Sequence, residues 1–175
     1  MRGRNGEVAY GAACPGGERI DVRDRDGALV FAVRGCAPAW KPRPDGDLTF
    51  VRDGSLVELE EPCRWERADC LRVVLSGRTV DRQLRRAWHV SSARFEIRRI
   101  RWLRDERLAA VVRRRARTGT DFLAVFSGSR LVRVALPERF AAAPCRPRRV
   151  PLRYPDGRKI FAFRGCSDVA VPAPS

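Results

Sequence analysis

The chain has 175 residues, of which 44% are hydrophobic and 33% are charged. This length suits one domain with a buried core, and no apolar run is long enough to form a membrane-spanning helix. The net charge of +15 invites a nucleic-acid or polyanion partner. All but two of the basic residues, Lys41 and Lys159, are arginines, and we favour the codon bias of a GC-rich genome over nucleic-acid binding as the cause.

Short strands and turns are expected in the first part of the chain. Residues 7–11 form a short apolar run, and residues 18–23 alternate polar and apolar side chains, which indicates a strand with one buried face. Asp26-Gly27 is a turn that leads into the apolar residues 28–33. Connections this short favour antiparallel neighbours over crossover helices.

The stretch 38–60 carries the clearest pattern in the sequence. Trp40 precedes the turn Pro44-Asp45-Gly46, in which proline presets φ and glycine accepts a positive φ. The strand formers of 47–52 follow, and Asp53-Gly54 is a strong hairpin signal before the strand 56–59. The sequence therefore predicts a strand, a tight turn and a returning strand.

A short helix interrupts this β pattern near 79–89. Val80, Leu84, Ala87 and Trp88 recur at helical spacing among arginines, after the strand 71–75, and Thr79 is the expected N-cap. We interpret the helix as an insertion between two β units. Trp88 and the only histidine, His89, are expected to be a packing residue and a surface residue, not ligands.

The strand and turn pattern in the second half of the sequence predicts one complete four-stranded unit and the start of another. Its four strands are 95–102, 108–113, 122–126 and 131–136, joined by short turns and one longer basic turn. The last unit begins near Val150, turns at Tyr154-Pro155-Asp156-Gly157 and continues through 158–163. Residues 172–175 are a tail, so we expect a single domain over 1–171.

An internal repeat links the two ends of the chain. Phe31-Ala32-Val33-Arg34-Gly35-Cys36 matches Phe161-Ala162-Phe163-Arg164-Gly165-Cys166 at all but one position. Two Pro-Asp-Gly turns and Trp102, in a diverged version of the same place, add to the pattern. Self-similarity at spacings of tens of residues is typical of repeat architectures.

These motifs resemble the WD-like β-propeller repeats of bacterial envelope proteins, such as the propeller domain of the Tol–Pal system. Trp40 with Pro44-Asp45-Gly46 matches with extra residues inserted, and Tyr154 with Pro155-Asp156-Gly157 matches without the serine. The unit at Trp102 keeps only the aromatic residue and the turn position. The resemblance implies an all-β fold of antiparallel meanders stacked as a small or incomplete β-propeller of about four blades, with structural and not catalytic roles for these residues.

The six cysteines point to an oxidising compartment. No Cys-x-x-Cys motif is present, so a zinc site is poorly supplied, and neither a metal nor a cofactor is expected. Cys63 and Cys70 bracket a short polar loop that a disulfide could close, although buried free thiols in a cytosolic protein are the alternative. The cysteines are Cys14, Cys36, Cys63, Cys70, Cys145 and Cys166.

Location and cysteine usage give conflicting signals. The first residues are not followed by a hydrophobic segment, so no secretory signal is seen in the sequence as given. The missing signal is compatible with an extracytoplasmic location if the sequence given is part of a longer one. We still expect a location in the cell envelope or outside the cytoplasm.

The predicted function is a non-catalytic module that binds an unidentified protein or small ligand. The alternative is nucleic-acid or polyanion binding through arginine clusters, with Trp88 or Trp102 stacking on bases. An enzyme is disfavoured, because Ser127-Gly128-Ser129 lacks the strand-to-helix context of a serine hydrolase and His89 is the only histidine. The arginine clusters are Arg98-Arg99, Arg113-Arg114-Arg115 with Arg117, and Arg146 with Arg148-Arg149, and the expected anion-binding residues are Arg113, Arg114, Arg115 and Arg117.

Overall fold

The computed structural model describes residues 6–14, 19–42, 47–60, 70–116, 121–134, 148–154, 156–165 and 169–170. Within these residues, fourteen strands form four sheets, and one helix, α1, accompanies them. This confirms the all-β class, the antiparallel meanders and the short helical insertion.

Three of the four sheets are simple antiparallel meanders. Sheet A contains β1 (Val8–Gly11), β2 (Arg19–Arg23) and β3 (Leu29–Arg34). Sheet B contains β4 (Cys36–Trp40), β5 (Leu48–Arg52), β6 (Ser55–Leu59) and β7 (Leu71–Leu75). Sheet C contains β8 (Phe95–Trp102), β9 (Leu108–Arg114), β10 (Asp121–Ser127) and β11 (Arg130–Val134).

Sheet D departs from the meander pattern. It contains β12 (Arg148–Arg153), β13 (Lys159–Gly165) and β14 (Val169–Ala170). The strand order is β13-β12-β14, in which β12 pairs with β13 antiparallel and with β14 parallel.

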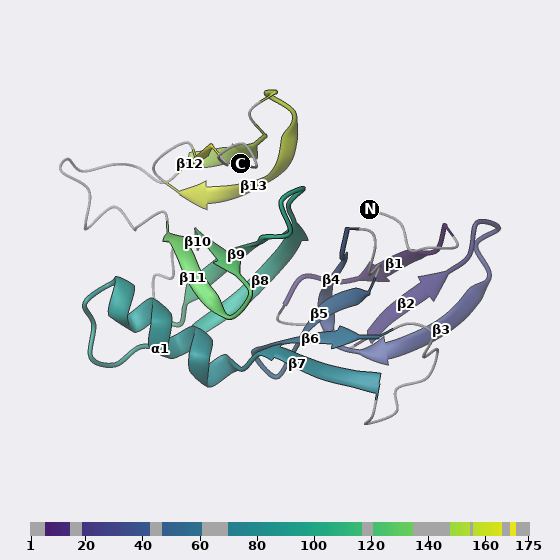
Figure 1. Cartoon of the computed structure of the whole chain (residues 1–175), viewed down its shortest axis with the longest axis horizontal. Helices are drawn as coiled ribbons and strands as arrows, with labels where there is room; N and C mark the ends of the chain where they lie inside the picture. Colours follow the sequence, from purple (N-terminus) through teal and green to yellow (C-terminus); the bar gives the residue numbers. More distant parts are fainter. Residues whose placement is uncertain are drawn as a thin grey trace.

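The four sheets follow one another around an arc, in chain order (Figure 1). Apolar side chains fill three layers: one between sheets A and B, one between sheets B and C, and one between sheets C and D. The first strands β1, β4 and β8 contact one another in succession, and β13 contacts β10. Among the described residues these sheets do not close into a ring.

The central strands β9 and β10 of sheet C are buried on both faces, and their sequence shows why. Along β9, Leu108 and Ala110 face the layer shared with sheet B, whereas Ala109 and Val111 face the layer shared with sheet D. A strand covered on both sides needs apolar residues at every position, which produces the continuous apolar run seen here.

The hairpins β2–β3 and β12–β13 are structural copies of each other. Ile20 pairs with Val33 as Val150 pairs with Phe163, and both hairpins carry the same register shift before their last pair. In the first turn Arg23 Nη1 donates to the Gly27 carbonyl at 2.9 Å, and in the second Arg153 Nη1 donates to the Gly157 carbonyl at 2.8 Å. The internal sequence repeat therefore corresponds to a repeat of three-dimensional structure.

Helix α1 (Gly77–Ala87) begins two residues earlier than predicted. The expected N-cap Thr79 is wrong, because the Thr79 backbone N–H donates to Ser76 Oγ at 3.2 Å and Ser76 is the cap. Val80 and Leu84 are buried against sheets B and C. Trp88 is buried at the end of the helix, with its ring centroid 4.1 Å from that of Phe122.

A disulfide joins Cys14, which follows β1, to Cys36, the first residue of β4, across a Cα–Cα distance of 5.6 Å. Beside it, the Ala37 backbone N–H donates to the Ala12 carbonyl at 2.9 Å. Cys70 is also disulfide-bonded, whereas Cys63, its predicted partner, lies outside the described residues. The Cys14–Cys36 bond was not predicted, and it fastens sheet A to sheet B.

Candidate functional site

The three aromatic residues of the predicted repeats lie between successive sheets. Trp40 ends β4 and packs in the layer between sheets A and B. Trp102 ends β8 and packs in the layer between sheets B and C. Tyr154 follows β12 and packs against the layer between sheets C and D. These residues hold sheets together, and their packing suggests no chemistry.

The predicted Pro-Asp-Gly turns are described only in part. Pro44, Asp45, Gly46 and Pro155 lie outside the described residues. In the second turn Asp156 Oδ1 accepts the Arg158 backbone N–H at 3.0 Å, and Gly157 has φ +82°. The hydrogen bond and the positive φ both belong to the turn itself.

The structure pairs two of the four predicted anion-binding arginines with acids. Arg113 Nε donates to Asp121 Oδ1 at 2.6 Å, and this hydrogen bond raises the pKa of the Arg113 guanidinium above its usual value. Arg115 Nε lies 3.9 Å from Glu96 Oε2. Arg114 is half-buried on β9 and has no ion pair with a described residue, and Arg117 lies outside the described residues. The 113–117 cluster therefore has much of its charge neutralised.

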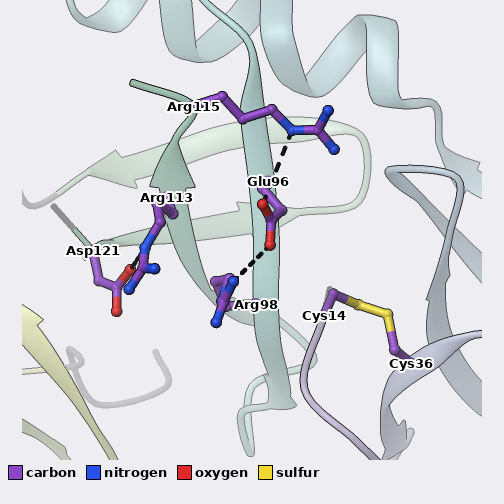
Figure 2. A network of polar contacts seen from close by, with 7 residues as sticks. All are labelled: Cys14, Cys36, Glu96, Arg98, Arg113, Arg115 and Asp121. Carbon is purple, nitrogen blue, oxygen red and sulfur yellow. Dashed lines mark hydrogen bonds and ion pairs between the residues drawn. A yellow bond between two sulfur atoms is a disulfide. The ribbon is translucent and has the colours of Figure 1, made fainter. Parts of the chain in front are cut away.

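Glu96 and Asp121 organise the charges on this part of sheet C. Figure 2 shows Glu96 between Arg98 and Arg115, with the Arg113–Asp121 pair on one side and the Cys14–Cys36 disulfide on the other. Arg98 Nη1 donates to Glu96 Oε1 at 2.9 Å. Both carboxylates are thus already engaged by arginines of their own sheet.

A groove of about 570 Å³ lies where sheet D meets sheet C. Val111 of β9 and Phe163 of β13 supply its apolar surface, and both pack in the layer between the two sheets. Its polar walls come from Arg98 and Arg99 of β8, Asp121 of β10 and Arg149 of β12. Ala13, next to the Cys14–Cys36 disulfide, closes one side.

The charges of the groove do not balance. Within the described part of the chain, Arg98 is paired with Glu96 and Asp121 with Arg113, but Arg99 and Arg149 have no ion pair. Both of these arginines are exposed. Two guanidinium groups from different sheets therefore line the groove without acidic partners.

The repeated hairpin explains why Arg149 is unpaired. In the first copy Arg19 Nε donates to Asp21 Oδ1 at 2.5 Å, and this bond lowers the pKa of Asp21 below its usual value. In the second copy Arg149 occupies the position of Arg19, and Pro151 occupies the position of Asp21. The proline cannot accept a hydrogen bond through its side chain, so the guanidinium of Arg149 loses the partner that the first hairpin provides.

Other candidate chemistry is not assembled by the described residues. His89 is exposed just after α1, Ser127 is the last residue of β10, and no hydrogen bond joins the two among the described residues. Trp88 and Trp102 are buried, which removes the predicted stacking platforms for bases. Over the described ranges no three His, Cys, Asp or Glu residues gather closely enough to hold a metal ion, and no helix could span a membrane.

The arginine-lined groove was partly visible in the sequence. Arg98-Arg99 and Arg148-Arg149 are among the arginine clusters of the sequence, although the expected anion-binding residues are Arg113, Arg114, Arg115 and Arg117. Only the packing of sheet D on sheet C brings Arg99 and Arg149 to one groove.

Comparison with known proteins adds no relative: no family model, no curated protein and no solved structure matches this chain.

Proposed function

We propose that the protein is a non-catalytic binding module that holds an anionic ligand in the groove between sheets C and D. The observation that carries this proposal is the pair Arg99 and Arg149, which line one groove from two sheets without acidic partners. Planar guanidinium groups bind phosphate, sulfate and carboxylate through two parallel hydrogen bonds. The apolar surface of Val111 and Phe163 adds contact area for the rest of the ligand.

The arrangement of the sheets supports a propeller-like module. The sheets stack face to face, their first strands β1, β4 and β8 contact one another, and an aromatic residue lies between each successive pair. In a propeller these first strands would line the centre, and Arg98 and Arg99 of β8 would face the ligand there. The disulfides of Cys14–Cys36 and Cys70 support a location outside the cytoplasm.

A second candidate function is polyanion binding over the helix surface. A cavity of about 750 Å³ lies between α1 and β11, lined by Arg82, Arg86 and Arg130. None of these three arginines has an ion pair within the described residues. A nucleic acid or other polyanion would bind these arginines through its charge, without an aromatic side chain stacking on nucleic-acid bases.

The test compares two double variants that remove the same charge. In Arg99→Gln/Arg149→Gln the groove loses its two unpaired guanidinium groups, and calorimetric affinity for pyrophosphate should fall at least about tenfold, since each hydrogen bond to a charged group contributes roughly 1.5–3 kcal/mol. In Arg82→Gln/Arg86→Gln the groove is intact, because neither side chain lines it, and pyrophosphate affinity should stay within about twofold.

Two further measurements separate the candidates. Pro151→Asp restores the partner that Asp21 provides in the first hairpin, so it should weaken pyrophosphate binding without removing an arginine. Retention on heparin that falls only in Arg82→Gln/Arg86→Gln would favour the helix surface. Equal pyrophosphate affinity in the wild type and both double variants would reject the groove.

A further inference from the structure

We infer that the cavity between α1 and β11 is a docking surface for an acidic peptide segment of a partner protein. Such a segment would be the polyanion of the second candidate function, on which this inference rests, and would not occupy the anion groove. The cavity has a volume of about 750 Å³, and its walls come from one side of the helix and from the start of the strand. Its lining residues are Arg82, Gln83, Arg86, Ala87, Arg130 and Leu131.

Three arginines line the cavity from two elements. Arg82 and Arg86 stand one helical turn apart on α1, which makes them neighbours on one side of the helix, and Arg130 is the first residue of β11. All three are exposed, and none has an ion pair within the described residues. Like charges at this spacing repel one another, whereas carboxylates placed between them form strong charge-assisted hydrogen bonds with the guanidinium groups.

The chain supplies no acid of its own to these arginines. Asp81 is the only acidic residue in α1, and its Oδ1 accepts the backbone N–H of Phe95, the first residue of β8, at 2.9 Å. This bond directs the Asp81 carboxylate toward β8, and no acidic residue is among the described residues that line the cavity. The positive charge of the cavity is therefore left for a partner to neutralise.

Gln83 fastens the two walls of the cavity to each other. Its Nε2 donates to the Ser129 carbonyl at 2.6 Å, and its Oε1 accepts the Leu131 backbone N–H at 2.5 Å. A neighbouring strand would make the same kinds of bonds, so the carboxamide occupies the edge of β11 at this point. The walls are therefore held in place before a partner arrives, and the partner is recognised by its side chains instead of being added as a further strand.

The lining favours a peptide over a nucleic acid. Ala87 and Leu131 supply apolar surface, which suits a small apolar side chain between two acidic ones. A nucleic-acid single strand is held by aromatic residues that stack on its bases, but the described lining contains none, and Trp88, the residue after Ala87, is buried. A duplex is held by many phosphate contacts along its length, whereas these arginines line one cavity.

The experiment follows the side-chain amide of Gln83 in two-dimensional ¹⁵N NMR spectra. Gln83 is the only glutamine and Asn5 the only asparagine of the chain, so Asn5→Ser identifies the Gln83 signals by elimination. The peptide acetyl-Glu-Ala-Glu-Glu-amide should shift these signals, and its neutral copy acetyl-Gln-Ala-Gln-Gln-amide should not. The indole signal of Trp102, which is buried between sheets B and C, should stay unchanged in both titrations.

Matched single variants test both walls. Arg86→Gln on the helix and Arg130→Gln on the strand should each weaken the acidic peptide at least about threefold, because each removes a charged donor from the cavity. Arg78→Gln removes the same charge from an exposed position of α1 outside the cavity, and its affinity should stay within about twofold of the wild type. An unchanged Trp102 indole signal verifies that each variant is folded.

The docking surface is rejected if millimolar peptide leaves the Gln83 signals in place, or if Arg86→Gln and Arg130→Gln bind the peptide as tightly as the wild type. A short oligothymidylate that shifts Gln83 at lower concentration than the peptide would overturn the peptide as partner and leave the polyanion function standing. Heparin retention that is equal in the wild type and Arg82→Gln/Arg86→Gln would reject that function as well. Peptide binding lost only in Arg99→Gln/Arg149→Gln would place the peptide in the anion groove and overturn the inference alone.

Discussion

Two residues at equivalent turn positions have a positive φ, which one of them adopts freely and the other adopts with backbone strain. Gly157 has φ +82° in the β12–β13 turn, and Glu106 has φ +59° in the β8–β9 turn. The turns share their backbone pattern: Tyr154 N–H donates to Arg158 O at 3.0 Å, and Leu103 N–H donates to Arg107 O at 2.8 Å. Glycine adopts this conformation freely, whereas a residue with a Cβ is strained there.

Exchanging the residue types should therefore change stability in opposite directions. Gly157→Ala should lower the free energy of unfolding by about 1–2 kcal/mol, because a Cβ at Gly157 meets no neighbour and the cost is the backbone alone. Glu106→Gly should raise it by a few tenths to about 1 kcal/mol. Urea denaturation of both variants measures the difference, and a neutral Gly157→Ala would contradict the turn geometry.

At single residues, the sequence predicts local chemistry and misses distant partners. Asp53 and Gly54 have φ 50° and 75°, as the two-residue hairpin predicted from their identity requires. The pairing of Arg113 with Asp121 is also within one hairpin, yet it was missed because charged residues near turns have many possible neighbours. The approach of Arg149 to Arg99 depends on how sheets D and C pack, which no local pattern records.

Between elements, a buried hydrogen bond connects sheets B and C. Trp102 Nε1 of β8 donates to Thr49 Oγ1 of β5, and Thr49 is completely buried. Removing one partner leaves the other unsatisfied in the core, whereas removing both is less costly. Thr49→Val should lower the free energy of unfolding by roughly 1–3 kcal/mol.

A double-mutant cycle with Thr49→Val and Trp102→Phe isolates this contact. The double variant should be more stable than the sum of the two single effects predicts, by about 0.5–3 kcal/mol, because the second change removes the orphaned group. Thermal or urea denaturation of the four proteins gives the coupling energy. Additive effects would mean that Trp102 and Thr49 act independently.

Elements with a clear pattern were predicted well, and the exceptions have identifiable reasons. The strands 95–102 and 108–113 agree with β8 and β9 within one residue, because apolar residues and turn residues mark their ends. Strand β4 was not predicted, since Cys36-Ala37-Pro38-Ala39-Trp40 contains a proline and no alternation, and Ala37 has φ 52°. The N-cap is Ser76 and not the predicted Thr79, because serine and threonine are both favoured N-cap residues and these two lie only three positions apart.

At the scale of the whole molecule, the Cys14–Cys36 disulfide joins the first two sheets. It closes a loop with a sequence separation of 22, for which the chain-entropy model gives about 3 kcal/mol of stabilisation. The Cys14→Ala/Cys36→Ala variant should lose that amount in urea denaturation. Because reductant would also break the disulfide of Cys70, the double variant isolates this bond.

Loss of the disulfide should also weaken pyrophosphate binding in the anion groove, because Ala13, next to Cys14, lines that groove. If stability falls as expected while pyrophosphate binds unchanged, the disulfide supports the fold without shaping the groove. The succession of sheets was predicted from repeats, but this bond was not, because cysteine connectivity depends on which strands become neighbours.

The repeated hairpin also has a consequence for how the chain oxidises. Cys36 and Cys166 each follow the same Phe-Ala-x-Arg-Gly segment, so a newly made chain offers Cys14 two thiols in matching local surroundings. The nearer one is favoured by the smaller entropy of loop closure, but only by roughly 1–2 kcal/mol. Correct maturation then depends on sheet A docking onto sheet B before oxidant arrives, and fast oxidation of the unfolded chain should trap scrambled isomers that an isomerase would rescue.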